Sequence, residues 1–124
     1  MTEENEVKPR GKFNDSSDPT LLAVRGQYEN KDEAKVYIKG LAKAISVVFQ
    51  KHQTVKLRCI GAASLNNAIK AHIIASGEAS KKGVSLALIP SFTTVSLDGD
   101  LERTAVVLEV IDYDEKSTSE PDKN

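Results

Sequence analysis

The chain has little of what enzymes, metalloproteins and disulfide-bonded proteins depend on. Its 124 residues include one cysteine, two histidines and no tryptophan. Cys59 cannot form an internal disulfide, and it has no cysteine or histidine partner at the spacing of a metal site. Neither a GxxxxGK[ST] phosphate loop nor a GxGxxG motif occurs. The sequence therefore predicts a non-catalytic protein, and we expect no cofactor and no metal.

Long apolar segments are also lacking. No apolar run approaches the roughly 20 residues that cross a bilayer. The first residues, MTEENEVKPRGKFNDSSDP, lack the basic-then-apolar order of a secretory signal. A lone cysteine suits a reducing compartment. We therefore expect a protein with no membrane association that resides in the cytoplasm, or in the nucleus if the source is eukaryotic.

Charge is unevenly spread along the chain, although the formal net charge is only −1. Residues 1–19 carry three basic against five acidic groups, and residues 112–124 carry two against five. Residues 20–111 carry twelve basic against eight acidic groups. A basic body between acidic ends suits a polyanionic ligand. An excess of this size is also ordinary for a globular domain, so charge alone leaves both interpretations open.

The pattern of apolar residues predicts one domain over residues 20–112. The polar ends, residues 1–19 and 113–124, are predicted to be a disordered arm and a disordered acidic tail. The domain is predicted to be α/β (α+β), in the order βαβαββ, with two helices packed on one mixed four-stranded sheet. The predicted strands cover residues 20–27, 54–60, 84–89 continued by 93–97, and 103–111.

Details of these elements follow from single residues. Asp32 is the predicted N-cap of the first helix, which ends at His52 and Gln53. Ser64 is predicted to start the second helix. Pro90 predicts a bulge or the end of regular strand pairing. The continuous apolar run before it predicts a central strand.

Apolar spacing assigns a buried face to each helix. We expect Gly40 to mark close packing of the first helix against a neighbour. The predicted buried residues of the first helix are Ala34, Ile38, Leu41, Ile45 and Val48. Those of the second are Leu65, Ala68, Ile69, His72 and Ile73. Cys59, in an alternating strand, is predicted to be a small core residue and not a nucleophile.

The segment IGAASLNNAIK, residues 60–70, is the most informative part of the chain. A strand ends in glycine, small residues follow, and a helix begins. Exposed amides at a helix N-terminus attract phosphate groups. We expect Asn66, Asn67 and Lys70 to project from the outer face of this helix as further donors. A tight turn selected only for packing accounts for the same spacing, so the alternative stays open.

Basic residues supply further candidate contacts. Lys31, Lys35, Lys39 and Lys43 recur every fourth residue and could follow a phosphate backbone, or could form a solvated face. Arg25 is expected on the outward side of the first strand. Arg103, in the last hairpin, is expected to contact phosphates. Few aromatic residues lie among these cations, which argues against a base-stacking platform.

Two segments resemble one known family. They are RCIGAASLNNAIKAHIIASG, from Arg58, and GVSLALIPSFTTVSLDGDLERTAVVLEV, which ends at Val110. They resemble stage V sporulation protein S (SpoVS), a family similar to the Alba-like nucleic-acid-binding proteins. The resemblance implies a βαβαββ fold, a homodimer and basic loops presented to nucleic acid, with a possible role in developmental or gene-expression regulation. The loop after the first strand departs from the Alba pattern, because GQYENKD carries only Lys31 where a lysine pair is expected.

Two hypotheses follow. The first is a homodimeric protein that binds DNA or RNA mainly through phosphates. Its candidate contacts are Arg25, Lys31, Lys35, Lys39, Gly61, Ala62, Ser64, Asn66, Asn67, Lys70 and Arg103. The second is a dimeric protein–protein interaction module that has lost nucleic-acid binding, which the acidic ends and acidic hairpin favour.

Overall fold

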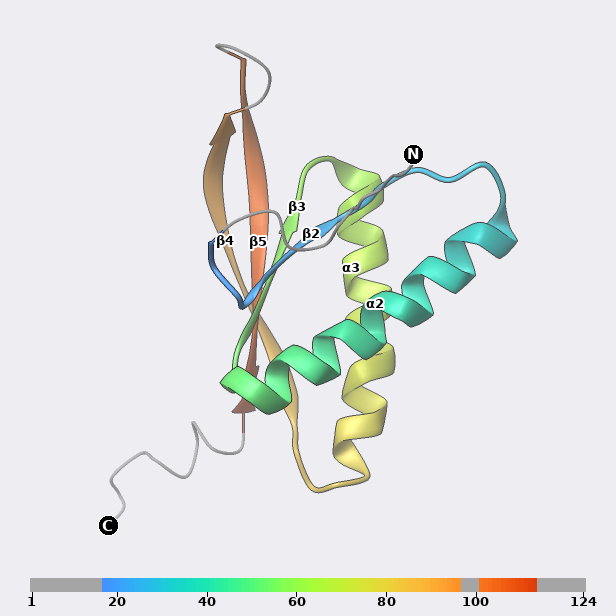
Figure 1. The fold of residues 1–124 in the computed structure, drawn as a ribbon, viewed down its shortest axis with the longest axis vertical. Coiled ribbons are helices and arrows are strands. Elements are labelled where there is room, and N and C mark those ends of the chain that lie inside the picture. The colour runs from blue at the N-terminus through green and yellow to red at the C-terminus, as the bar shows by residue number, and fades with distance from the viewer. Residues whose placement is uncertain (1–16, 97–100, 114–124) are drawn as a thin grey trace.

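The computed structural model describes residues 17–96 and 101–113. Their elements follow the predicted βαβαββ order, which is thereby confirmed (Figure 1). The elements are β2 (Leu21–Val24), α2 (Lys31–His52), β3 (Val55–Cys59), α3 (Ala62–Ser80), β4 (Leu86–Ser96) and β5 (Glu102–Asp112). The predicted arm and tail lie almost wholly outside the described residues. Of the helices in the described part, none has the length and apolar character to cross a membrane.

The four strands form one mixed sheet, as predicted, and lie in the order β2-β3-β5-β4. β2 and β3 are parallel, whereas β5 is antiparallel to both β3 and β4. The last β3–β5 pair is Cys59 with Val106, but β4 and β5 remain paired as far as Ser96 with Glu102. The β4–β5 hairpin therefore extends beyond the other strands as an arm (Figure 1).

β4 corrects two expectations. The apolar run predicted a central strand, but β4 lies at the edge of the sheet. Pro90 was predicted to interrupt pairing, yet the register runs unbroken through Pro90 and Leu108. An edge strand tolerates proline because one side of its backbone has no partner strand to which an N–H must donate.

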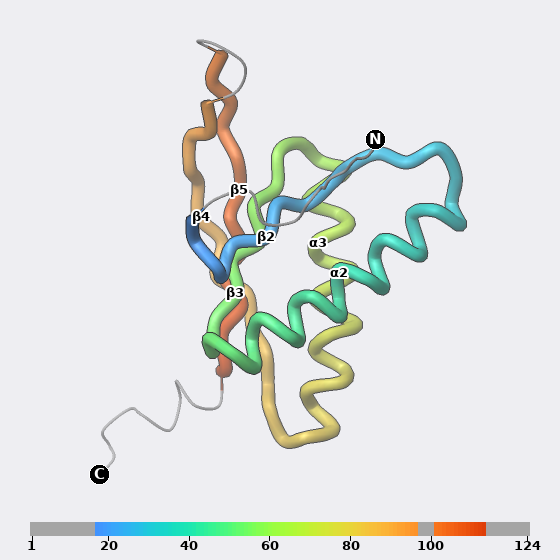
Figure 2. The backbone as a smooth tube through the Cα atoms, in the orientation of Figure 1, coloured from blue at the N-terminus to red at the C-terminus, as the bar shows by residue number. Residues whose placement is uncertain are grey.

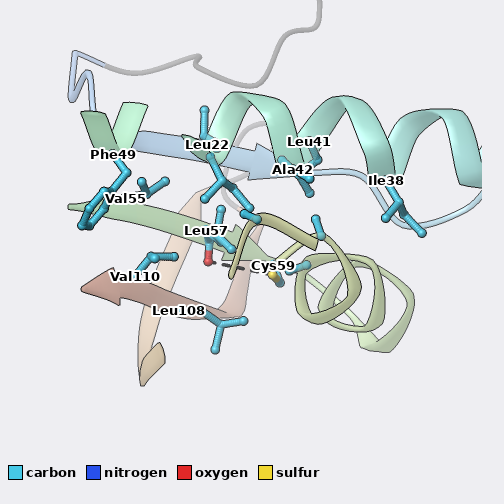
Figure 3. Packing of buried hydrophobic residues seen from close by; sticks show 14 residues of the cluster. Leu22, Ile38, Leu41, Ala42, Phe49, Val55, Leu57, Cys59, Leu108 and Val110 are labelled. Atoms are coloured by element: carbon cyan, nitrogen blue, oxygen red, sulfur yellow. Dashed lines mark hydrogen bonds between the residues drawn. The ribbon is translucent and has the colours of Figure 1, made fainter. Parts of the chain in front are cut away.

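Both helices cover one face of the sheet and enclose the core with it (Figure 3). Strand alternation directs Val55, Leu57 and Cys59 of β3 toward the helices. β5 contributes Leu108 and Val110. From the helices come Ile38, Leu41, Ala42, Ile45, Phe49, Ala68, Ala71 and Ala75. The core assignment of Cys59 is confirmed, and burial raises the pKa of its thiol to about 11.

The start of α2 differs from the prediction by two residues. Asn30, not Asp32, is the N-cap, and its Oδ1 accepts from the Glu33 backbone N–H at 2.8 Å. Glu33 in turn accepts from the Glu29 N–H at 3.1 Å, so the acidic side chain closes the first turn. The helix ends at His52, as predicted, and Gln53 after it adopts the left-handed region. Gly40 is exposed, and no neighbouring element comes within 4 Å of the position that a Cβ would take, so the expected close packing is absent.

The buried face of α3 is only partly the predicted one, since Ala68 is buried and Leu65 packs against the core as expected. Ala68, Ala71 and Ala75 are fully buried, whereas Ile69 and Ile73 are exposed. Spacing alone favoured the larger apolar residues for the core. The small alanines allow α3 to approach α2 and the sheet closely, and this contact turns the isoleucines to solvent.

Candidate nucleic-acid interface

The loops that follow β2 and β3 meet at one end of the molecule. Because the two strands are parallel, their carboxyl ends lie at the same edge of the sheet. The N-termini of α2 and α3 and the hairpin arm point toward that end (Figures 1 and 2). We call residues 25–30 and 60–63 the loop end.

Asn67 ties the two loops together. Its Nδ2 donates to the backbone carbonyls of Arg25 and Gly26, each at 3.0 Å. The side chain was predicted on the outer face of α3, but the residue is only 6% exposed. Both amide N–H groups of Asn67 are therefore used within the protein. Asn67 is therefore a positioning residue and is not available to a ligand.

Two glycines shape the loop end. A Cβ on Gly26 would lie 3.3 Å from both the Ala63 Cβ and the Ser64 backbone nitrogen, so the loops touch closely here. Gly61 adopts φ +94° and ψ 164°, a conformation that other residues rarely take. The glycine that the sequence singled out thus allows the reversal from β3 into α3.

α3 begins without a side-chain cap. Gly61 is its N-cap, no side chain accepts from its first amides, and its first turn contains no acidic residue. The predicted start at Ser64 is wrong by two residues. The Ser64 hydroxyl is buried and donates toward the carbonyls of Ile60 and Gly61 at 3.0 and 3.1 Å. Gly61, Ala62 and Ala63 are exposed, so the positive end of the helix faces solvent.

Arg25 is the cation of the loop end. It is exposed and follows the end of β2, one residue beyond the strand in which it was expected. Its guanidinium carbon lies 4.4 Å from the centroid of the Tyr28 ring and 5.8 Å from that of Tyr37. Its backbone N–H donates to the Tyr37 hydroxyl at 2.9 Å. These aromatic contacts fix the position of the cation.

Sequence reasoning missed both tyrosines. Each carries a phenol whose pKa is raised above its ordinary value mainly by burial, so both rings stay neutral beside Arg25. The sequence does show two tyrosines on either side of the start of α2. Their short distance from Arg25, however, follows only from the turn of the loop. Glu29 and Glu33 line the same shallow pocket as Arg25 and oppose its charge.

The lysines of the predicted set divide into two groups. Lys31 is exposed at the first residue of α2. Lys35, Lys39 and Lys70 line one open groove between α2 and α3. The structure therefore brings three predicted cations together, although their groove is otherwise lined by isoleucines. Asn66, next to the buried Asn67, is exposed on α3 as predicted.

Arg103 lies apart from this groove. It pairs with Val95 on the hairpin arm and is exposed. Strand alternation places it on the opposite sheet face from Leu108 and Val110, which pack against the helices. Arg103 and the helix groove therefore lie on opposite faces of the sheet.

A family model described as stage V sporulation protein S matches residues 32–113 of the chain. The chain belongs to the SpoVS family. The resemblance found in the sequence is thus confirmed, and the family relates the chain to sporulation. The SpoVS match runs from the first turn of α2 to the end of β5 and includes Gly61, Lys70 and Arg103. Arg25 lies before the matched residues. Its position near Gly61 and the start of α3 is therefore known from the structure and not from the family match.

Proposed function

We propose that this SpoVS-family protein is a non-catalytic, cytoplasmic nucleic-acid-binding protein that contacts the phosphates of DNA or RNA as a homodimer. The observation that carries the proposal is the loop end, where Arg25 and the uncapped start of α3 are held beside each other by Asn67. A guanidinium and a helix N-terminus are both groups that phosphate oxygens favour.

The hairpin arm extends the proposed surface. Arg103 is exposed on an arm that projects beyond β3. An arm of this kind lets a cation reach a second stretch of backbone. Lys31, Lys35, Lys39 and Lys70 add to the positive field that attracts a polyanion. In a homodimer, which the family resemblance supports, two arms and two loop ends would act together.

Phosphate contact fits these residues better than base recognition. The Tyr28 and Tyr37 rings already lie against Arg25. Glu29 and Glu33 weaken the local field. We therefore expect binding of low sequence specificity, with a dissociation constant on the order of 10⁻⁴–10⁻⁶ M at physiological salt.

Fluorescence anisotropy tests the proposal. The probes are a labelled 20-base-pair DNA duplex, the matching single strand and an RNA hairpin, each titrated at several salt concentrations between roughly 50 and 200 mM. We expect saturable binding to at least one probe, with affinity that falls steeply as salt rises. Absence of binding at the lowest salt, or affinity independent of salt, would argue against a phosphate interface.

One observation favours a second function. Glu29 and Glu33 lie beside Arg25 and would repel a phosphate group. A protein that does not bind nucleic acid can carry acidic residues at these positions without losing its function. A dimeric protein–protein interaction module is therefore the alternative. Protein partners that stay bound to the purified chain after nuclease treatment, together with no affinity for the three probes, would favour this alternative.

A further inference from the structure

α3 presents its larger apolar residues to solvent. Its alanines face the core, whereas Ile69, Ile73 and Ile74 are 37, 62 and 42% exposed. Single exposed apolar residues are common on protein surfaces, but adjacent ones on one helix form a patch. Water contact with this patch costs free energy, which a binding partner would recover.

The isoleucines do not stand on a flat surface. Ile73 and Ile74 line a groove of about 360 Å³ together with Ile38 of α2. Lys35, Lys39 and Lys70 complete the lining, and no acidic side chain takes part. Among the described residues, no ion pair involves any of these three lysines. The groove thus combines an apolar surface with uncompensated positive charge on both helices.

We infer that this groove binds an acidic amphipathic segment of another protein, a function beyond the proposed nucleic-acid binding. Aliphatic side chains of the segment would cover the isoleucines, and its carboxylates would pair with the lysines. Charge complementarity selects an acidic partner. A phosphate backbone would satisfy the lysines but would leave the isoleucines exposed. A lipid surface suits a protruding apolar face better than a groove.

The test uses a synthetic probe on the full chain. A fluorescein-labelled 15-residue helical peptide carries leucines at positions i, i+4, i+7 and i+11 with glutamates beside them. A second peptide carries lysines in place of the glutamates. Anisotropy should show binding of the acidic peptide only. Ile73→Ser and the Lys35→Gln/Lys39→Gln double variant should each weaken it by about tenfold.

Matched controls separate the groove from a general surface effect. Val36 is 72% exposed on α2 but does not line the groove, so Val36→Ser should leave peptide affinity unchanged. Lys43→Gln is the corresponding charge control, because Lys43 is exposed on the same helix outside the groove. Duplex DNA, titrated against Ile73→Ser, reports the proposed nucleic-acid surface separately and should bind as it does to the unchanged chain.

Several results would overturn the groove assignment. These are no binding of the acidic peptide, equal binding of both peptides, or equal effects of Ile73→Ser and Val36→Ser. Loss of the dimer on sedimentation of Ile73→Ser would instead assign the groove to a second copy of this chain. Ile73-dependent binding to phosphatidylglycerol vesicles, without peptide binding, would assign it to lipid. Loss of DNA binding with peptide binding intact would refute only the proposed function.

Discussion

Asn67→Ala is the most informative single change, because Asn67 joins the two loops of the proposed interface. The substitution removes two hydrogen bonds of 3.0 Å and leaves the carbonyls of Arg25 and Gly26 without that donor. Each neutral hydrogen bond contributes about 1 kcal/mol to stability, so the loss is about 2 kcal/mol. Alanine has a higher helix propensity than asparagine and returns about 0.6 kcal/mol. The free energy of unfolding should therefore fall by about 1.5 kcal/mol.

Asn66→Ala is the matched control for this change. Asn66 is the neighbouring residue in α3, but it is exposed and its side chain forms no hydrogen bond in the described part of the chain. Substitution of Asn66 by alanine changes only the helix propensity and should stabilise the protein by about 0.6 kcal/mol. The difference in unfolding free energy between the two variants, about 2 kcal/mol, measures the contribution of the two Asn67 hydrogen bonds.

Urea unfolding followed by circular dichroism measures both variants. Equal free energies of unfolding for Asn66→Ala and Asn67→Ala would show that the Asn67 hydrogen bonds do not stabilise the fold. That result would also refute the view that they hold Arg25 beside the start of α3. A second readout is nucleic-acid affinity under folding conditions. It should fall in Asn67→Ala and stay unchanged in Asn66→Ala, because only the first substitution frees the Arg25 loop.

Three further results are expected. Gly61→Ala should destabilise the protein by about 1–3 kcal/mol through backbone strain at φ +94°. Gly77→Ala, inside α3, should instead stabilise it by up to about 1 kcal/mol. Urea midpoints of the two variants that move in the same direction would contradict this contrast. Burial lowers the pKa of His72 below 6.5, so the unfolded chain binds a proton more readily below that pH and stability falls as pH falls through this window. His72→Gln should flatten that part of the stability–pH curve, and an unchanged curve would count against it. Cys59, with a pKa raised to about 11 by burial, should resist a disulfide reagent in the folded chain and react once urea unfolds it; rapid reaction in native buffer would place the thiol at the surface.

The sequence predicted the element order because its apolar periods are regular. α2 has a clear stripe that includes Ile38, Leu41 and Ile45, and the structure buries these residues. β3 alternates cleanly, so its inward residues were predictable. β4 was misassigned because a continuous apolar run is expected of a central strand. Its position at the edge depends on where β5 inserts in the sheet, which no local pattern encodes.

The candidate site was predicted less completely than the fold. Gly61 was recognised, since a glycine between a strand and a helix is typical of a sharp reversal that needs its conformational freedom. Asn67 was assigned to the outer face of its helix and Ser64 to the helix start, but both side chains donate to backbone carbonyls of the protein. The contact between Arg25 and Tyr37 joins residues twelve positions apart. Such contacts are set by tertiary packing, which a single sequence does not reveal.

The salt dependence of DNA binding tests the central claim most directly. Each phosphate contact contributes about 0.9 to the slope of log K against log salt, so the Arg25→Gln/Arg103→Gln double variant should lose about 1.8. Lys81→Gln is the control, because Lys81 lies at the far end of α3, beside Glu78. Its slope should match that of the unchanged chain. A double variant with an unchanged slope, or a control with an equal loss, would contradict the assignment of phosphate contacts to the loop end and the hairpin arm.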